Sequence, residues 1–221
     1  MGALFVKMCG ITTGDDALAA DEAGADAVGF NFYPRSKRYI APEKAADIIG
    51  RMPAGILRVG VFVNPSPGEV QAAINNSGIN ALQFSGNEEP GNVSGFGLPV
   101  MKAVHITDIK SIDAMKFFSV DSYLLDTFNA DEFGGTGRTF DWSIAVQAKR
   151  FGRIVIAGGL TPENVAEAVR AVKPYGVDVS SGVELRPGIK DKQKVKDFIL
   201  RAREAHSLNE DHAEFSKNKI S

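Results

Sequence analysis

Short runs of hydrophobic, often β-branched residues recur along the chain, with stretches of helical periodicity between them. Runs of this length and nearly continuous apolar character are typical of parallel strands that are buried on both faces. The eight predicted strands are Leu4–Met8, Ala27–Phe32, Leu57–Val63, Ala81–Phe84, Val100–Val104, Ser122–Leu125, Arg153–Ala157 and Gly176–Val179.

Helix signals lie between these strands. Ser66 to Glu69 has the sequence of a capping box with proline at the first helical position. Thr161-Pro162 repeats the cap-then-proline start, and Pro42 opens another helix. The exception is Glu88 to Gly97, where three glycines and a proline predict a fourth helix that is short or absent. The last apolar helix face is formed by Val195, Phe198, Ile199 and Ala202.

Eight strands that alternate with helices form either an open doubly wound sheet or a closed (β/α)8 barrel. A dinucleotide-binding sheet would carry a glycine fingerprint after its first strand, but the chain reads Cys9-Gly10-Ile11-Thr12 there. With about 28 residues per unit, we predict a single-domain α/β protein with the TIM-barrel architecture and a short or irregular fourth helix. The barrel is expected over residues 1–203, followed by a polar C-terminal tail over 204–221.

Composition narrows the function classes. The 25 basic and 27 acidic residues give a net charge of −2, which argues against nucleic-acid and membrane-surface binding. The single cysteine forms no internal disulfide and excludes a zinc site built on several thiolates. No signal sequence or membrane span is apparent, so the expected location is cytoplasmic. The outer helices show no obvious apolar patch, and we expect a monomer or weak homodimer.

Active sites of such barrels lie at the carboxyl ends of the strands, where two ionisable residues stand out. Cys9 ends the first strand, and Lys7 precedes it by two residues and so points to the same face. A cation beside the thiol favours thiolate, a base or nucleophile, although many free cysteines are simply small buried residues. Asp126 ends the sixth strand, and since no helix starts there, it is a better acid/base candidate than a helix cap.

Anion-binding signals lie at other strand ends. The glycine-rich turns at Gly158-Gly159 and Ser180-Ser181-Gly182 follow the seventh and eighth strands, where these barrels commonly hold phosphate. The alternative is two tight turns that need glycine for positive φ. Arg38 is either a clamp for a carboxylate or an ordinary solvated charge. The glycine-rich loop 132–138 either closes over a ligand or is a mobile connection.

Together these motifs resemble the phosphoribosylanthranilate isomerase family of tryptophan biosynthesis. They occur in order from residue 6 to about residue 200 and cover nearly all of the predicted barrel. The matching segments are 6–12, 29–40, 60–64, 125–126 with 134–142, 157–165 and 178–184.

The resemblance implies an Amadori rearrangement of a phosphoribosyl substrate, a small molecule, with no metal or redox cofactor. By the family's pattern Asp126 is the acid, Cys9 is the base, Arg38 holds the anthranilate carboxylate and the two glycine-rich turns hold the phosphate. The other predicted substrate contacts are Lys7, Gln83 and Asp178.

Two further residues, Asp178 and Ser85, refine the predicted site. Asp178 lies on the strand that faces the first one, so it is expected to pair with Lys7 and offset the cost of burying a lone charge. The family usually has histidine where this chain has Ser85, a shorter hydrogen-bonding residue that carries no charge.

Two other classes of function remain as alternatives at this stage. One is another phosphosugar barrel enzyme, such as the aminoaldose isomerase of histidine biosynthesis or ribulose-phosphate 3-epimerase. The former family has aspartate where this chain has Cys9, and the latter needs a metal and histidine ligands. The other alternative is a non-catalytic phosphosugar-binding barrel, against which the paired Cys9 and Asp126 argue.

Overall fold

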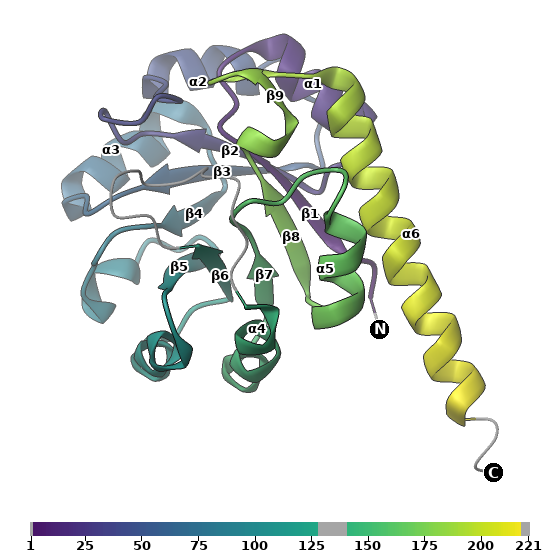
Figure 1. Ribbon diagram of the computed structural model, residues 1–221. Helices are drawn as coiled ribbons and strands as arrows, with labels where there is room; N and C mark the ends of the chain where they lie inside the picture. Colours follow the sequence, from purple (N-terminus) through teal and green to yellow (C-terminus); the bar gives the residue numbers. More distant parts are fainter. Residues whose placement is uncertain (1, 128–140, 218–221) are drawn as a thin grey trace.

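The structure, a computed structural model, describes residues 2–127 and 141–217. Eight parallel strands close into a barrel in sequence order, with the last strand paired to the first (Figure 1). The predicted (β/α)8 barrel is therefore confirmed. The strands are β1 (Phe5–Cys9), β2 (Ala27–Asn31), β3 (Leu57–Phe62), β4 (Ala81–Phe84), β5 (Val100–Ile106), β6 (Ser122–Thr127), β7 (Ile154–Ile156) and β8 (Gly176–Val179).

Helices surround the barrel, and two of the connections are 3₁₀ rather than α-helical (Figure 1). The glycine- and proline-rich fourth connection forms only the short helix η1 (Pro90–Val93), as predicted. The fifth connection, η2 (Ile109–Phe117), is also 3₁₀, which the sequence pattern did not indicate. The remaining helices are α1 (Gly14–Glu22), α2 (Pro42–Ile49), α3 (Pro67–Ser77), α4 (Trp142–Ala148), η3 (Lys149–Phe151), α5 (Val165–Val172), η4 (Ser181–Val183) and α6 (Lys192–Lys217).

Of the three predicted helix starts, two are confirmed and one is not. Pro42 begins α2 as predicted. Ser66 and Glu69 form the complete capping box at the start of α3, with the Glu69 carboxylate accepting from the Ser66 backbone at 2.7 Å. Thr161 does not cap α5, because that helix begins at Val165 after an extra turn. The Thr161 hydroxyl instead accepts a hydrogen bond from the backbone N–H of Glu163, so the prediction of a threonine cap was wrong.

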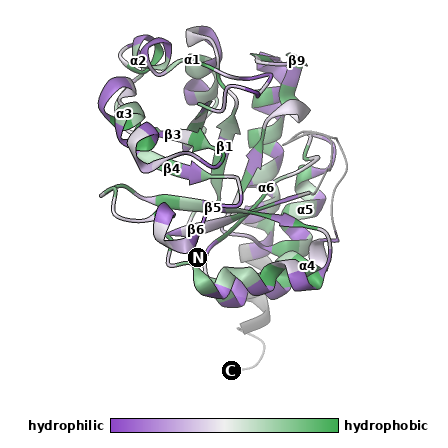
Figure 2. Cartoon of the chain, turned by 90° about the vertical axis from the view of Figure 1, so that its left-hand side faces the viewer, coloured by the Kyte–Doolittle hydropathy of each residue, from purple (hydrophilic) through white to green (hydrophobic). Residues whose placement is uncertain are grey.

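Strand alternation divides the core into an inner and an outer part. Inside the barrel, small clusters form around Val59, Val61, Met101 and Leu124. The larger cluster lies between the outer faces of the strands and the helices, whose exposed faces carry hydrophilic residues (Figure 2). The interior is therefore filled near its base and leaves the carboxyl ends of the strands available for a site.

Helix α6 runs without a break through residue 203 to Lys217 and extends past the barrel (Figure 1). Its predicted apolar face is buried, and Ala205 beyond it is also buried. The amide of Asn209 donates to the Val169 carbonyl at 3.3 Å, so contacts with the barrel continue beyond the predicted boundary. A separate tail after residue 203 stays a prediction.

Within the described part of the chain, none of the helices is both long enough and apolar enough to cross a membrane.

Candidate active site

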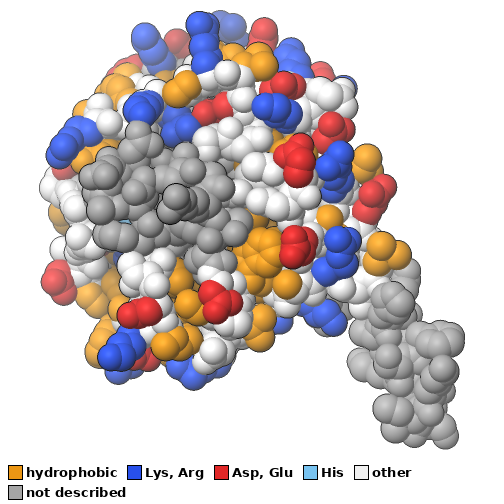
Figure 3. Space-filling view, in the orientation of Figure 1, with side chains coloured by type: hydrophobic (Ala, Val, Ile, Leu, Met, Phe, Trp, Pro, Cys, Tyr) orange, Lys and Arg blue, Asp and Glu red, His pale blue; other side chains and the backbone are white. Residues whose placement is uncertain are grey.

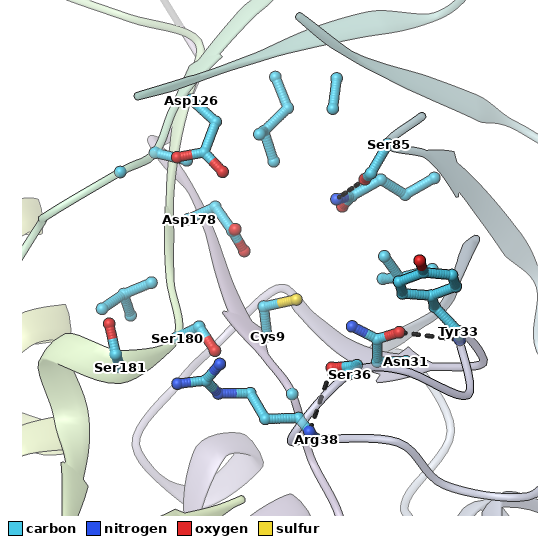
Figure 4. Close-up of a pocket in the computed structure, with 18 of the residues that line it drawn as sticks. Cys9, Asn31, Tyr33, Ser36, Arg38, Ser85, Asp126, Asp178, Ser180 and Ser181 are labelled. Atoms are coloured by element: carbon cyan, nitrogen blue, oxygen red, sulfur yellow. Dashed lines mark hydrogen bonds between the residues drawn. The ribbon is translucent and has the colours of Figure 1, made fainter. Parts of the chain in front are cut away.

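A cavity of about 400 Å³ opens at the carboxyl ends of the strands (Figure 4). Its walls combine apolar side chains of the inner barrel with the polar residues that end each strand. Of the predicted site residues only Lys7 is absent from the lining. Those that line the cavity are Cys9, Arg38, Gln83, Asp126, Gly158, Gly159, Asp178, Ser180, Ser181 and Gly182.

A buried ion pair lies beside Cys9 at the bottom of the cavity. Lys7 and Asp178 are register partners on β1 and β8, and the Lys7 ammonium donates to the Asp178 carboxylate at 2.8 Å. The predicted pairing is confirmed, with Lys7 fully buried. Gly29 on β2 makes room for both neighbours, since a Cβ there would lie 3.0 Å from Cys9 Sγ and 3.2 Å from Lys7 Nζ.

The protonation state of Cys9 differs from the sequence-based expectation. Burial is the largest influence and raises the pKa of the Cys9 thiol, while the Lys7 charge lowers it only in part. For Lys7, burial opposes the charged form, but attraction to Asp178 and Cys9 outweighs it and raises the pKa of the ammonium. The site without substrate therefore holds a charged lysine next to a protonated thiol, and Lys7 alone does not produce thiolate.

Arg38 reaches from the loop after β2 across the end of β1. Gly10 has φ of +77°, and a Cβ there would lie 2.5 Å from Arg38 Cδ and 3.0 Å from Ser180 Oγ, so the crossing requires glycine. The guanidinium forms a two-pronged pair with Glu184, with Nε and Nη2 each 2.8 Å from a carboxylate oxygen. Arg38 is thus held at the rim of the cavity near Ser180 (Figure 4).

Glu184 and Lys190 are site-supporting residues that the sequence reasoning missed. They lie on a hairpin after β8, formed by β9 (Glu184–Arg186) and β10 (Ile189–Lys190). Burial would raise the pKa of Glu184, but the hydrogen bond from Arg38 and the pairing with Lys190 outweigh it and lower that pKa. The Pro187-Gly188 turn was the available signal, because such a pair between two short runs indicates a hairpin.

The two glycine-rich turns lie against each other at the ends of β7 and β8. Gly158 and Gly159 have φ of +76° and +65°, so this turn does need glycine for its backbone conformation. A Cβ on Gly182 would overlap the Leu160 carbonyl, which shows how closely the second turn approaches the first. Asn164 braces the first turn by donating to the Gly159 carbonyl at 2.9 Å.

The opposite wall presents an amide and a histidine around Ser85. Gln83 is 5% exposed, and its amide donates to the Ser85 hydroxyl at 3.0 Å. The His105 ring lies 3.2 Å from the Ser85 carbonyl, and burial lowers its pKa, so the ring is neutral at neutral pH. His105 is the register partner of Asp126 on the next strand, which places both at the same level of the cavity.

Within residues 2–127 and 141–217, no three metal-ligating side chains gather closely enough to hold an ion. The loop 132–138, which was considered as a cover for a ligand, lies outside the described residues.

The fold and the site together define a (β/α)8 barrel protein with a thiol and a carboxyl group facing one cavity at the carboxyl ends of its strands. The chain belongs to the N-(5'-phosphoribosyl)anthranilate (PRA) isomerase family, whose model matches residues 6–201.

Individual relatives agree with this assignment. The N-(5'-phosphoribosyl)anthranilate isomerase of Geotalea uraniireducens is 52% identical over 198 residues, covering 90% of this chain and 98% of that relative. A crystal structure of mutually generated monomers of the dimeric phosphoribosylanthranilate isomerase from Thermotoga maritima has a TM-score of 0.81 at 41% identity. The match covers 91% of this chain and 99% of that one. A PRA isomerase in complex with reduced 1-(o-carboxyphenylamino)-1-deoxyribulose 5-phosphate also has a TM-score of 0.81, at 40% identity over 91% of this chain and 99% of that one.

Proposed function

We propose that this chain catalyses the Amadori rearrangement of N-(5-phosphoribosyl)anthranilate, an aminoaldose, to 1-(2-carboxyphenylamino)-1-deoxyribulose 5-phosphate in tryptophan biosynthesis. The observation that carries the proposal is the placement of Cys9 and Asp126. Cys9 ends β1 and Asp126 is the next-to-last residue of β6. The two residues line one cavity, and β7 and β8 separate their strands on the shorter side. An acid and a base on different sides of one bound sugar are what this rearrangement requires.

Binding of the substrate relies on its two anionic ends. The phosphate is assigned to the turns at Gly158-Gly159 and Ser180-Ser181-Gly182, which border the cavity side by side. The carboxylate is assigned to Arg38, whose guanidinium plane is fixed by Glu184. Binding of a carboxyphenylamino ribulose phosphate by a related protein supports a ligand of this shape and charge.

Ring opening is assigned to Asp126. Its carboxyl group, holding a proton, transfers that proton to the furanose ring oxygen while the bond between this oxygen and C1 breaks. The nitrogen lone pair forms a double bond to C1, which gives an iminium ion and leaves Asp126 as a carboxylate. His105 at the same level is neutral, so it brings no positive charge to this part of the cavity.

The second proton transfer is assigned to Cys9. Its thiolate removes the proton from C2, and the electrons of that bond form the enolamine, which tautomerises to the ketone. Because burial keeps the thiol protonated in the free protein, the order of steps matters. The iminium ion adds a positive charge beside Cys9 after ring opening, and this charge favours loss of the thiol proton to solvent, which leaves the thiolate when the base is needed.

The charges near Cys9 fit an anionic substrate. The charges of Lys7 and Asp178 cancel each other. Glu184 pairs with both Arg38 and Lys190, so these three residues leave one positive charge in excess.

We further propose a cytoplasmic location and a monomer or weak homodimer, as expected for a biosynthetic enzyme of this family.

The direct test mixes the protein with freshly formed phosphoribosylanthranilate and follows the loss of substrate fluorescence. We expect turnover by the unmodified chain and a loss of at least ~10²-fold in kcat for Cys9→Ser and for Asp126→Asn. Arg51→Gln, an exposed change after α2 at the other end of the barrel, serves as a control and is expected to retain full activity. Near-normal turnover by either site variant would refute the role assigned to that residue.

A further inference from the structure

Lys190 is a buried lysine at the end of the β9–β10 hairpin, and the mechanism above does not use it. It is 2% exposed, and its side-chain nitrogen has no exposed surface. The hairpin packs on the loop after β1 and on the first turn of α1. The Thr12 hydroxyl in the loop donates to the Gly188 carbonyl, and the Asp16 carboxylate in α1 accepts from the Lys190 backbone. Burying a lysine here is costly unless the ammonium is fully satisfied.

The Lys190 ammonium has an acceptor for each of its three N–H groups. It donates to the Cys9 carbonyl at 2.6 Å, to the Ser180 carbonyl at 3.1 Å and to the Glu184 carboxylate at 2.9 Å. These acceptors belong to three different parts of the site: the strand that carries the thiol, the turn assigned to phosphate, and the carboxylate that orients Arg38.

The Lys190 ammonium lies where the pairing of β1 with β8 stops, and it connects the ends of these two strands. The register of these parallel strands runs as far as Met8 opposite Val179. One residue further, Cys9 and Ser180 would be the next partners, and Lys190 bridges their two carbonyl groups instead. The lysine therefore fixes the ends of β1 and β8 where the strand pairing stops.

We propose that Lys190 is a positioning residue of the active site, which holds Cys9, the Ser180 turn and Arg38 in one geometry and supplies a positive charge next to the thiol. The proposal rests on the proposed function for the roles of these groups, but its contacts and charge do not depend on the substrate.

Electrostatics agree with the second part of this role. Burial raises the pKa of Cys9, Lys7 lowers it, Asp178 raises it and Lys190 lowers it again. The charged groups that act on the thiol are therefore Lys7 on β1, Asp178 on β8 and Lys190 on β10. Asp178 offsets Lys7 as Glu184 offsets Lys190, and burial lowers the pKa of the Lys190 ammonium, so Lys190 adds to the positive charge near the thiol while it is protonated.

The experiment uses Cys9 as its own probe, because the chain contains one cysteine. The ultraviolet absorbance of the thiolate is titrated against pH in the full chain without substrate. We expect Lys190→Met to shift the titration to higher pH, with about tenfold less thiolate at a given pH below the midpoint. Lys190→Arg, which keeps the charge, is expected to restore most of the titration, and the exposed Lys192→Met is expected to leave it unchanged.

A second variant tests the sign of the effect. Glu184→Gln keeps the shape of the side chain but removes the negative charge that balances Lys190. It is expected to shift the Cys9 titration to lower pH, opposite to Lys190→Met, whereas a merely structural role would give no opposed shifts. This variant also keeps the proposal testable if Lys190→Met does not fold.

Turnover supplies the geometric readout. Loosening both Arg38 and the Ser180 turn should raise KM and lower kcat in Lys190→Met, with kcat/KM reduced by about tenfold or more. An unchanged thiol titration in Lys190→Met and Glu184→Gln, together with unchanged kcat and KM, would overturn the proposal. Failure of the proposed function is a distinct result, since an unmodified chain without turnover would still show the shifted thiol titrations.

Discussion

Lys7 and Lys102 are both buried lysines within barrel strands, but their side chains leave the sheet on opposite faces. Lys7 shares the inner face of β1 with Cys9 and pairs with Asp178. Lys102 lies between Met101 and Ala103, which face the barrel interior, so its own side chain points outward. There it pairs with Glu88 at 2.9 Å, in the connection after β4.

Their hydrogen-bond partners separate the two lysines in function. The Lys102 ammonium donates to Glu88 and also to the carbonyl groups of Phe84, Gly86 and Ala103. All N–H groups of the Lys102 ammonium are therefore used in contacts within the wall of the barrel, which indicates a structural role. Lys7 donates to Asp178 and also acts, through a hydrogen bond and its charge, on the Cys9 thiol that lines the cavity. A buried ion pair alone therefore does not indicate chemistry, and its neighbours decide what it does.

Between the two lysines, the largest expected effect on activity comes from Lys7→Met. It leaves the Asp178 carboxylate buried without its counter-ion and removes a positive charge from beside Cys9, so kcat is expected to fall by ~10²-fold or more. The double variant Lys7→Met/Asp178→Asn removes both charges. It is expected to recover thermal stability but not turnover, as measured by thermal melting and the fluorescence assay. Recovery of turnover in the double variant would mean that Lys7 serves stability alone.

Lys102→Met should show the reverse pattern. Removing one partner of this buried pair is expected to lower the free energy of unfolding by about 3–5 kcal/mol, because Glu88 keeps an uncompensated charge. Activity per folded molecule should change much less than in Lys7→Met. Urea unfolding and active-site-corrected turnover check both parts, and a loss of kcat comparable to that of Lys7→Met would remove the distinction between the two lysines.

A smaller effect is expected where the two glycine-rich turns meet. Gly182→Ala would push a methyl group into the Leu160 carbonyl and move the turns apart. KM should rise by about tenfold with a smaller change in kcat, the effect of losing one hydrogen bond to a charged group. Gly68→Ala in α3, where a Cβ would meet no atom within 4 Å, is the matched control. An unchanged KM in Gly182→Ala would place phosphate binding elsewhere.

The smallest effect is a pH dependence of stability at Glu184. Its pKa in the folded protein lies below the usual 4.5, so the carboxylate stabilises the fold above that pH, and this contribution is lost as pH falls through the lowered pKa. Glu184→Gln should therefore be less stable than the unmodified chain at neutral pH, with the difference shrinking on acidification. Urea unfolding at several pH values checks this, and a difference that stays constant would contradict the assigned ion pairs.

These contrasts also show how far the sequence could lead. The strand pattern predicted the barrel, and neighbouring strand ends correctly suggested that Asp178 would meet Lys7. Strand alternation predicts which face of the sheet a side chain lies on, but not which loop residues contact it there. The ion pair between Lys102 and Glu88 was therefore not predictable. Lys190 and Glu184 were missed for the same reason, because they belong to a hairpin outside the regular βα units.

The protonation of Cys9 was harder still. The pKa of Cys9 depends on opposing influences: burial and Asp178 raise it, whereas Lys7 and Lys190 lower it. The sequence showed one of the lysines but neither the degree of burial nor the second lysine. A residue can thus be located from a motif while its chemical state requires the three-dimensional surroundings.

The most direct test of the central claim separates the two proton transfers with substrate deuterated at C2. In Cys9→Ser, removal of the C2 proton should limit a single turnover, and a clear primary isotope effect is predicted. In Asp126→Asn, ring opening precedes C2 chemistry and should limit the rate, so the isotope effect should be close to one. The reverse pattern, or an equal isotope effect in both variants, would contradict the assignment of Asp126 as the acid and Cys9 as the base.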